Sequence, residues 1–181
     1  MEVSHLIQRC IKKDPIAQEE LYRLCYKVMI NTCLRYGGDH DKAGMIFNNA
    51  MLRLFQAIRN YRDEGKFWSW AKTIVTNCCI DFAKKEIPNF KAADIEAEDE
   101  VYILPEALST LSSKEIHLAI SKLPKNAALV FKLFIYEGFS HRQIAETLNI
   151  TEGTSKSQVN YARKLLFEKL QEYQTYKAPL L

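Results

Sequence analysis

A short segment in the last third of this 181-residue chain is crowded with hydrogen-bonding and cationic side chains. Its members are Thr154, Lys156, Ser157, Gln158, Asn160, Arg163 and Lys164. Hydroxyl, amide and ammonium groups in the first turns of a helix match the donors and acceptors on base edges in the DNA major groove, and cations farther along reach phosphates. The segment therefore predicts DNA binding, with residues 154–160 at the bases and Arg163 and Lys164 at the backbone.

Other residues that could carry chemistry lack the partners that they would need. Carboxylates are paired at Asp39 and Asp41 and at Asp63 and Glu64, but in polar turns without a nucleophile or a metal-binding companion. Neither the five cysteines nor the four histidines have the spacing of a zinc site or a disulfide framework. They are Cys10, Cys25, Cys33, Cys78, Cys79, His5, His40, His117 and His141. We expect no enzymatic activity, no metal site, no cofactor, and mostly buried, reduced thiols.

Two helices and a turn must position the DNA-binding side chains. The sequence predicts a first helix over 140–148, a turn over 149–153, and a long second helix from Thr154 to about Tyr173. Ala145 is small where the two helices cross. The shared apolar core is supplied by Ile144, Leu148, Ile150 and Val159. This arrangement predicts a helix-turn-helix, and the alternative is a helical hairpin with a polar outer face.

The rest of the chain is also helical by its apolar periodicity, without the alternation typical of strands. Asp14 is the predicted cap of the first long helix, with Pro15 in its first turn and Gly37 and Gly38 at its end. The expected helices span 16–36, 41–60, 67–85, a segment beginning at Ser113, and 127–136.

Charge and composition divide the chain into two blocks. Residues 1–86 hold 14 Lys and Arg against 10 Asp and Glu, residues 87–112 hold 1 against 6, and residues 113–181 hold 10 against 6. The middle segment contains Pro88 and Pro105 and no persistent apolar face, so it is assigned as an acidic, flexible linker. The predicted fold class is all-α, with two small helical domains. Two mildly basic domains fit contact with phosphates, although ordinary surface charge gives the same totals.

The sequence also indicates where the protein resides. Its longest apolar stretch, around 129–136, contains Lys132 and is too short to cross a bilayer. Glu2, Gln8 and Arg9 interrupt the first residues, which therefore do not resemble a secretory signal. We expect a cytoplasmic protein.

Motifs in both blocks carry a resemblance to a known family. The C-terminal block contains Leu123-Pro124, the run Phe131-Lys-Leu-Phe-Ile-Tyr-Glu-Gly-Phe-Ser, Gln143-Ile-Ala-Glu-Thr-Leu, and the run over 153–166. The N-terminal block contains Asp14-Pro-Ile-Ala-Gln-Glu-Glu-Leu-Tyr, Leu52-Arg-Leu-Phe, and the run over 67–85 that begins Phe-Trp-Ser-Trp. In order and spacing these motifs resemble the extracytoplasmic-function sigma factors over nearly the whole chain except the linker and the tail.

The resemblance implies a sigma factor that directs RNA polymerase to promoters, with polymerase core and promoter DNA as partners and an anti-sigma factor as a further candidate partner. It implies that 113–181 reads the −35 element, whereas 1–86 binds the polymerase and captures the melted −10 strand. The residues matched to −10 capture are Tyr61, Arg62, Lys66, Lys72 and Asn77. Those matched to polymerase binding are Asn48, Asn49, Leu52, Arg53 and Phe55. Phe67 and Trp70, spaced with Ile74, are instead expected in the core.

The chain departs from the family pattern in both domains. Where the family usually has an acidic residue and a Gln-Glu pair for contact with the polymerase, this chain has Met45, Asn48 and Asn49. Polymerase binding should therefore depend only mildly on salt. In the second helix of the helix-turn-helix, Ser155 stands where Val is common, and Gln158 and Tyr161 where Arg is common. These changes predict weaker or differently specified binding of the upstream element.

Two other functions fit parts of the sequence. One is a transcription regulator that binds duplex DNA through the helix-turn-helix and uses the N-terminal block to sense or dimerise. Polymerase binding distinguishes a sigma factor from this regulator. In the other, the N-terminal block is purely a protein-interaction module, which recovery of an inhibitory partner without DNA binding would favour.

Overall fold

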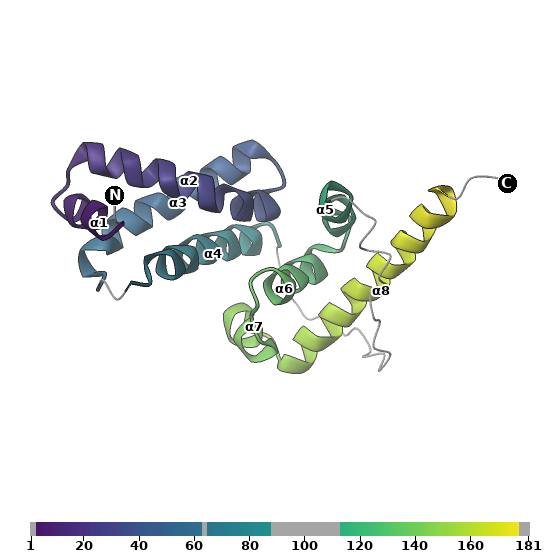
Figure 1. Ribbon diagram of the computed structural model, residues 1–181. Coiled ribbons are helices and arrows are strands. Elements are labelled where there is room, and N and C mark those ends of the chain that lie inside the picture. Colours follow the sequence, from purple (N-terminus) through teal and green to yellow (C-terminus); the bar gives the residue numbers. More distant parts are fainter. Residues whose placement is uncertain (1–2, 63–64, 88–112, 178–181) are drawn as a thin grey trace. The chain divides into compact units, whose positions relative to one another are not determined.

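The computed structural model describes residues 3–62, 65–87 and 113–177. Within these ranges every regular element is helical, which confirms the predicted all-α class. The chain divides into two compact units, Met1–Glu86 and Ile87–Leu181 (Figure 1). The linker predicted over 87–112 lies outside the described residues, apart from Ile87 at its start. No helix in the described ranges is long and apolar enough to cross a membrane.

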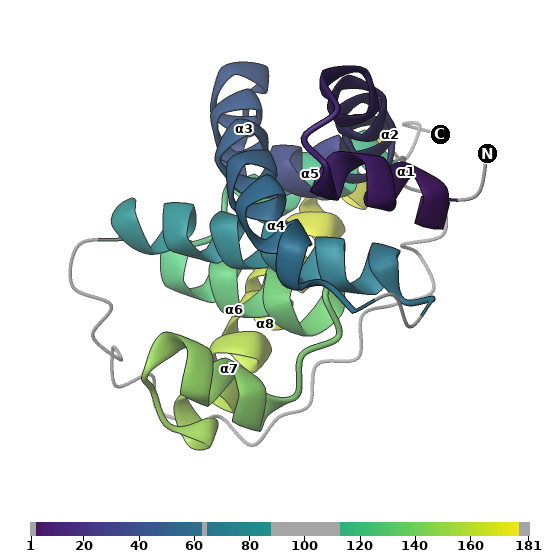
Figure 2. The same cartoon turned by 90° about the vertical axis from the view of Figure 1, so that its left-hand side faces the viewer.

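The N-terminal unit contains α1 (Val3–Ile11), α2 (Pro15–Gly37), α3 (His40–Ala57), a 3-10 turn (Ile58–Asn60) and α4 (Phe67–Lys85). Helices α2, α3 and α4 pack against one another, and α1 packs on α2 (Figure 1 and Figure 2). Side chains with less than 2 % of their surface exposed fill the space between them, including Leu6, Leu21, Phe47, Leu54 and Val75. All five cysteines are buried and unbridged, as predicted for their burial.

The start and end of α2 confirm the expected signals. The Asp14 carboxylate accepts hydrogen bonds from the backbone N–H groups of Ile16 and Ala17 at 3.0 and 3.2 Å, so it caps the helix. Gly38 ends the helix with φ of 82°, in the left-handed region that favours glycine. A Cβ on Gly37 would lie 2.8 Å from the backbone nitrogen of Ala43, so the close approach of α2 and α3 also requires glycine there.

The following helix differs slightly from its predicted bounds. It begins at His40 because Asp39 is its N-cap and accepts from the backbone N–H of Lys42 at 2.8 Å. Its α-helical part ends at Ala57, and residues 58–60 tighten into a 3-10 turn, a common way for a helix to end.

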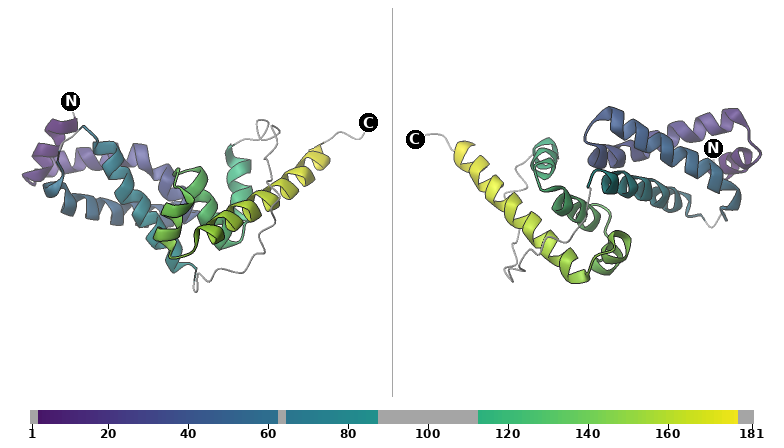
Figure 3. Two further views of the ribbon diagram at one scale, coloured as in Figure 1. Left: turned by 90° about the horizontal axis from the view of Figure 1, so that it is seen from below. Right: turned by 180° about the vertical axis from the view of Figure 1, so that it is seen from behind.

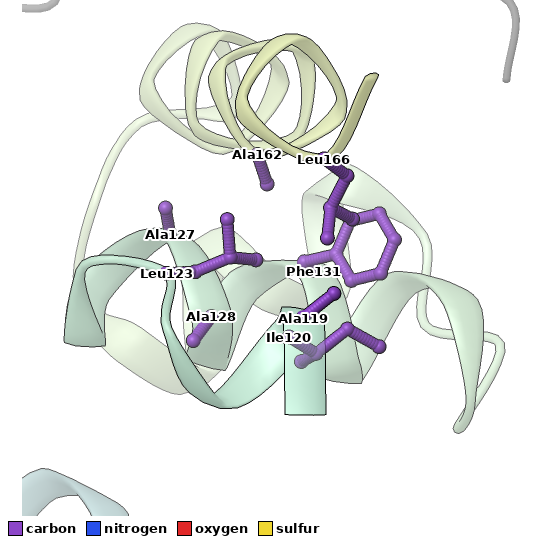
Figure 4. Packing of buried hydrophobic residues seen from close by; sticks show 8 residues of the cluster. All are labelled: Ala119, Ile120, Leu123, Ala127, Ala128, Phe131, Ala162 and Leu166. Atoms are coloured by element: carbon purple, nitrogen blue, oxygen red, sulfur yellow. The ribbon is translucent and has the colours of Figure 1, made fainter. Parts of the chain in front are cut away.

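The C-terminal unit contains α5 (Ser113–Ser121), α6 (Lys125–Ile135), α7 (His141–Leu148) and α8 (Glu152–Lys177). Helices α5, α6 and α7 pack against the first part of α8, which extends beyond α7 (Figure 3). Phe131, Leu123 and Ile120 form a buried cluster with Ala162 and Leu166 of α8 (Figure 4). This cluster fixes which side of α8 faces inward.

The predicted start of the last helix at Thr154 is two residues late, because α8 begins at Glu152. The Thr151 hydroxyl accepts the backbone N–H of Thr154 at 3.0 Å and takes the role of the cap. Glu152 and Gly153 therefore belong to the helix and not to the turn, and the turn is shorter than expected.

Candidate DNA and protein interfaces

Helices α7 and α8 form the helix-turn-helix that the sequence predicts. Ser140 and Gln143 make a reciprocal capping box at the start of α7, with hydrogen bonds of 3.2 and 2.9 Å. Asn149 ends α7 with φ of 56°, a left-handed conformation that asparagine adopts more easily than most residues. Ile144, Ala145 and Leu148 are buried beneath the turn. Sharp caps at both ends of α7 hold the start of α8 in a fixed position.

The predicted DNA-contacting side chains of α8 do not all face outward. Lys156 is exposed, and five others are half-buried, namely Thr154, Ser157, Asn160, Arg163 and Lys164. The Thr154 hydroxyl pairs with that of Thr151 at 2.9 Å, and the Ser157 hydroxyl donates to the Thr154 carbonyl at 3.1 Å. The structure thus leaves Lys156 as the most accessible of the predicted base readers.

Gln158 is the exception among these residues. It is only 2 % exposed, and it lies on the inward side of α8 with Ser155, Val159 and Ala162. Helical periodicity explains this position, since residues 155, 158, 159 and 162 recur at three- and four-residue spacing. A side chain enclosed in this way does not reach a base edge, so the assignment of Gln158 as a base reader is wrong for this conformation.

The sequence analysis did not identify the contact between His141 and Ser155. Nδ1 of His141, the first residue of α7, lies 2.9 Å from the hydroxyl oxygen of the fully buried Ser155 on α8. The imidazole stacks on the Phe134 ring of α6 at 4.6 Å and 14°, and the Arg163 guanidinium lies 5.8 Å from the centre of the same ring. Burial, then the charges of Lys156 and Arg163, lower the pKa of His141 below its ordinary 6.5, although Glu152 opposes this.

The residues predicted to capture the −10 strand lie in the loop between the 3-10 turn and α4 and on α4 itself. Arg62, Lys66, Lys72 and Asn77 are exposed. Asn77 lies five positions after Lys72, which corresponds to a rotation of about 140° around the helix, so the two side chains do not share one side of α4. Residues 63–64 lie outside the described residues.

Tyr61 is less available than the sequence suggested. Its ring packs on Trp70 at 4.8 Å and on Phe67 at 5.8 Å, and its buried hydroxyl has no hydrogen-bond partner among the residues that the structure describes. Phe67 is 3 % exposed, as expected for a core residue, whereas Trp70 is half-buried. The three rings form one aromatic cluster at the start of α4.

Trp68 is an aromatic side chain that the sequence analysis overlooked. It is 36 % exposed and lies four residues before Lys72, on the same side of α4. The buried Phe67, Ala71 and Val75 recur at four-residue spacing, and Trp68 does not belong to this series. The sequence pattern therefore indicates that Trp68 faces solvent. An exposed tryptophan beside a cation can stack on an unpaired base.

The residues predicted to bind polymerase are mostly accessible on α3. Leu52 is 59 % exposed, and Asn48 and Asn49 are also exposed. Met45, which lies outside the predicted set, is 60 % exposed seven residues before Leu52. This spacing places them along one side of the helix. The Asn48 side-chain oxygen already accepts a 2.7 Å hydrogen bond from the Tyr22 hydroxyl of α2.

The other two members of this predicted set are more restrained. Phe55 is half-buried, and Arg53 makes a 2.8 Å ion pair with Asp81 of α4. The result is a mixed apolar and amide surface, suited to contact with a protein more than with a polyanion.

Models of two sigma-70 family regions match the chain. Sigma-70 region 2 matches residues 21–86, which lie in the N-terminal unit, and Sigma-70 region 4 matches residues 113–166, which include α5, α6, α7 and the first part of α8. The second match begins where α5 begins and includes α7, the turn and the first part of α8.

Several curated relatives match most of the chain. The ECF RNA polymerase sigma factor SigW of Bacillus subtilis is 27 % identical over 169 residues, which cover 87 % of this chain and 86 % of the relative. The RNA polymerase sigma-H factor of Pseudomonas aeruginosa is 24 % identical, with 92 % of each chain covered. The ECF RNA polymerase sigma-E factor of Escherichia coli K12 is 22 % identical, over 92 % of this chain and 93 % of the relative.

Proposed function

Because this chain belongs to the extracytoplasmic-function class of sigma factors, we propose that its two helical units recognise two separate elements of a promoter. As a sigma factor it binds RNA polymerase core and promoter DNA and is not an enzyme. The match to region 2 over residues 21–86 argues against a regulator that works without polymerase.

The C-terminal unit is proposed to bind the −35 element through α8. The observation that carries this assignment is the capped helix-turn-helix, which presents Lys156 to solvent near the start of the second helix. In such motifs the first turns of the second helix contact base edges, and cations farther along contact phosphates. We assign Lys156, Ser157 and Asn160 as base contacts, whereas Arg163 and Lys164 hold the backbone. Thr154, whose hydroxyl is hydrogen-bonded to that of Thr151, orients the start of α8.

The N-terminal unit is proposed to hold the unpaired −10 strand at the start of α4. Trp68, Lys66 and Lys72 supply an exposed aromatic ring and two cations within about two helical turns. Asn77 provides an amide that can hydrogen-bond the edge of an extruded base. Stacking on an aromatic ring contributes roughly 1–3 kcal/mol per base, which helps offset the few kcal/mol needed to unpair it.

The same unit is proposed to bind polymerase core through one side of α3. Its centre is Met45 and Leu52, since exposed apolar side chains on a helix gain most from burial in a partner. Asn48 and Asn49 contribute neutral hydrogen-bonding groups, so the affinity for core should fall little as salt rises. We propose that the protein acts in the cytoplasm, where polymerase is found. We also propose that an anti-sigma factor restrains it.

In vitro transcription with purified core and a genomic DNA library tests the proposed function. Initiation at a set of related promoters that core alone does not use is the expected result. A matched variant, Lys156→Ala, should shift the upstream preference and leave the downstream element unchanged. If the chain binds core yet confers no promoter preference, the division of recognition between the two units is wrong.

A further inference from the structure

We infer that His141 is a positioning residue for DNA recognition, which holds the start of α8 through Ser155 and couples a proton to the binding of the upstream element. The inference rests on the proposed function of α8 as the −35 reader.

Ser155 is a buried polar residue. Its side chain is fully enclosed at the interface of α7 and α8, and its hydroxyl lies 2.9 Å from Nδ1 of His141. A buried hydroxyl that loses its partner is costly, because it cannot regain the hydrogen bond from water. The imidazole therefore favours the one placement of α8 in which this hydrogen bond is made.

Three helices meet at the His141 imidazole. His141 opens α7, stacks on Phe134 of α6 at 4.6 Å, and contacts Ser155 of α8. Lys156, the most accessible of the predicted base readers, directly follows Ser155 in the chain. A shift of the Ser155 hydroxyl would consequently move the Lys156 side chain relative to the groove.

Charged side chains of α8 act on the His141 imidazole. Lys156 and Arg163 of α8 disfavour a protonated imidazole, whereas Glu152 of the same helix favours it. On α7 the neighbouring Arg142 is paired with Glu146 at 3.1 Å, and from α6 the contact is the uncharged Phe134 ring. A phosphate at Arg163 and the acceptor groups of a base edge at Lys156 would offset these positive charges, so bound DNA should make protonation of His141 easier.

The sign of the pH effect follows from this change. In the free protein the pKa of His141 lies below its ordinary 6.5, and in the DNA complex it should be higher. Protons are therefore taken up on binding at a pH between these two values, and the affinity for DNA should rise as the pH falls through that window. The protonated ring donates from Nδ1 to the Ser155 hydroxyl oxygen, and the neutral ring accepts from that hydroxyl or donates to it according to its tautomer, so the contact is kept in both states.

The test uses the full chain bound to polymerase core and a duplex whose upstream element is selected from a random library. Affinity is measured by competition at constant ionic strength between about pH 5 and about pH 8, because the window begins below 6.5. For the parent we expect tighter binding at the lower pH, by at most about tenfold per pH unit for one coupled proton. His141→Gln keeps a hydrogen-bonding group but cannot be protonated, so its pH profile should be flatter. His40→Gln, a change at an exposed histidine in the other unit, should follow the parent.

A second set of variants tests positioning apart from titration. His141→Phe can stack on Phe134 but leaves the Ser155 hydroxyl without its partner, so DNA binding at about pH 8 should weaken several-fold. Adding Ser155→Val replaces the polar contact with an apolar one, and the double variant should recover affinity without recovering the pH dependence. Thermal melting of each variant separates this result from general loss of folding.

Each outcome has a definite consequence. If His141→Gln keeps the parent's pH profile, or His40→Gln loses it, His141 is not the coupled group and the inference fails. If His141→Phe binds as tightly as the parent, the positioning role fails. A holoenzyme that selects no upstream sequence would overturn the proposed role of α8 and this inference with it, whereas a holoenzyme that selects one but shows the same affinity and pH profile for the parent, His141→Gln and His141→Phe overturns the inference alone.

Discussion

The Arg53 guanidinium on α3 lies 2.8 Å from the Asp81 carboxylate on α4, and this ion pair joins the helix proposed to bind polymerase to the helix proposed to bind DNA. Both side chains remain about half exposed, at 54 % and 50 %. Exposed ion pairs contribute only about 0–1 kcal/mol, because water and salt screen them. Arg53 is therefore partly committed within the unit, and its neighbour Leu52 is the freer contact for a partner.

This contrast predicts different effects of two adjacent substitutions. Leu52→Ala should weaken the binding of polymerase core by about 1–2 kcal/mol, since a largely exposed leucine would lose its burial in the partner. Arg53→Ala should cost less and should lose its effect at high salt. Fluorescence anisotropy competition with labelled parent protein measures both. A larger effect of Arg53→Ala at every salt concentration would move the centre of the interface toward α4.

A second prediction separates phosphate contact from burial on α8. Lys164→Ala should weaken binding to all duplexes by a similar factor and reduce the slope of log affinity against log salt by about one. Gln158→Ala should leave base preference unchanged and lower the free energy of unfolding by about 1–2 kcal/mol, because the side chain is buried. Selection from a random library and urea denaturation measure the two effects. A changed base preference for Gln158→Ala would restore it as a reader.

A third prediction concerns the aromatic cluster at the start of α4. Because the buried Tyr61 hydroxyl has no partner in the described part of the chain, Tyr61→Phe should be neutral or stabilising and should open promoters normally. Tyr61→Ala removes ring contacts with Phe67 and Trp70 and should slow opening on duplex DNA. Permanganate footprinting on duplex and pre-melted templates reports opening. Equal rates for the parent and Tyr61→Ala on the duplex would exclude Tyr61 from strand capture.

Trp68 supplies a matched comparison for that experiment. Trp68→Ala removes a ring that is 36 % exposed but lies 5.3 Å from the ring of the buried Phe67, so it should cost some stability. It should slow opening by up to the roughly 1–3 kcal/mol of one stacked base. A pre-melted bubble should recover part of the loss. Melting curves like the parent's, together with unchanged opening, would show that Trp68 has no part in holding the strand.

The fourth prediction follows from the cap of α2. The pKa of the Asp14 carboxyl is held below its ordinary value of 3.8, first by the hydrogen bond from Arg9 and then by the backbone N–H of Ala17. Its stabilising effect is therefore complete above that value and is lost as the pH falls through the lower pKa of the folded state. Asp14→Asn keeps a good cap without the charge, so its stability should fall less over this range. Urea unfolding at several acidic pH values compares the two proteins, and parallel curves would contradict the prediction.

The fifth prediction concerns the thiols. Burial raises the pKa of Cys10 to about 11 and that of Cys25 to about 12, and thiol reagents attack the thiolate. All five cysteines are buried, so a disulfide reagent should modify the folded protein slowly and report the unfolding transition in urea. Rapid modification of any one thiol under native conditions would indicate local opening of the N-terminal unit.

Local sequence signals determined most of the helices and their ends. Asp14 with Pro15, Gly38, and the Ser140-to-Gln143 box each act within a few residues, so their chemistry could be read without the fold. The family motifs likewise lie in continuous runs, and they led to the sigma-factor assignment. The prediction for the start of α8 is late because the sequence pattern assigns Glu152 and Gly153 to the turn, whereas the Thr151 hydroxyl caps the helix two residues earlier.

The functional surfaces depended more on tertiary structure, because a residue's type does not say which way its side of a helix faces. Gln158 reads as a DNA contact in the sequence, yet the packing of α8 on α6 and α7 encloses it. Tyr61 reads as an exposed aromatic, whereas Phe67 and Trp70 cover its ring. The contact between His141 and Ser155 joins positions 14 residues apart on two helices, and only the crossing of those helices at the turn brings the imidazole to the buried hydroxyl.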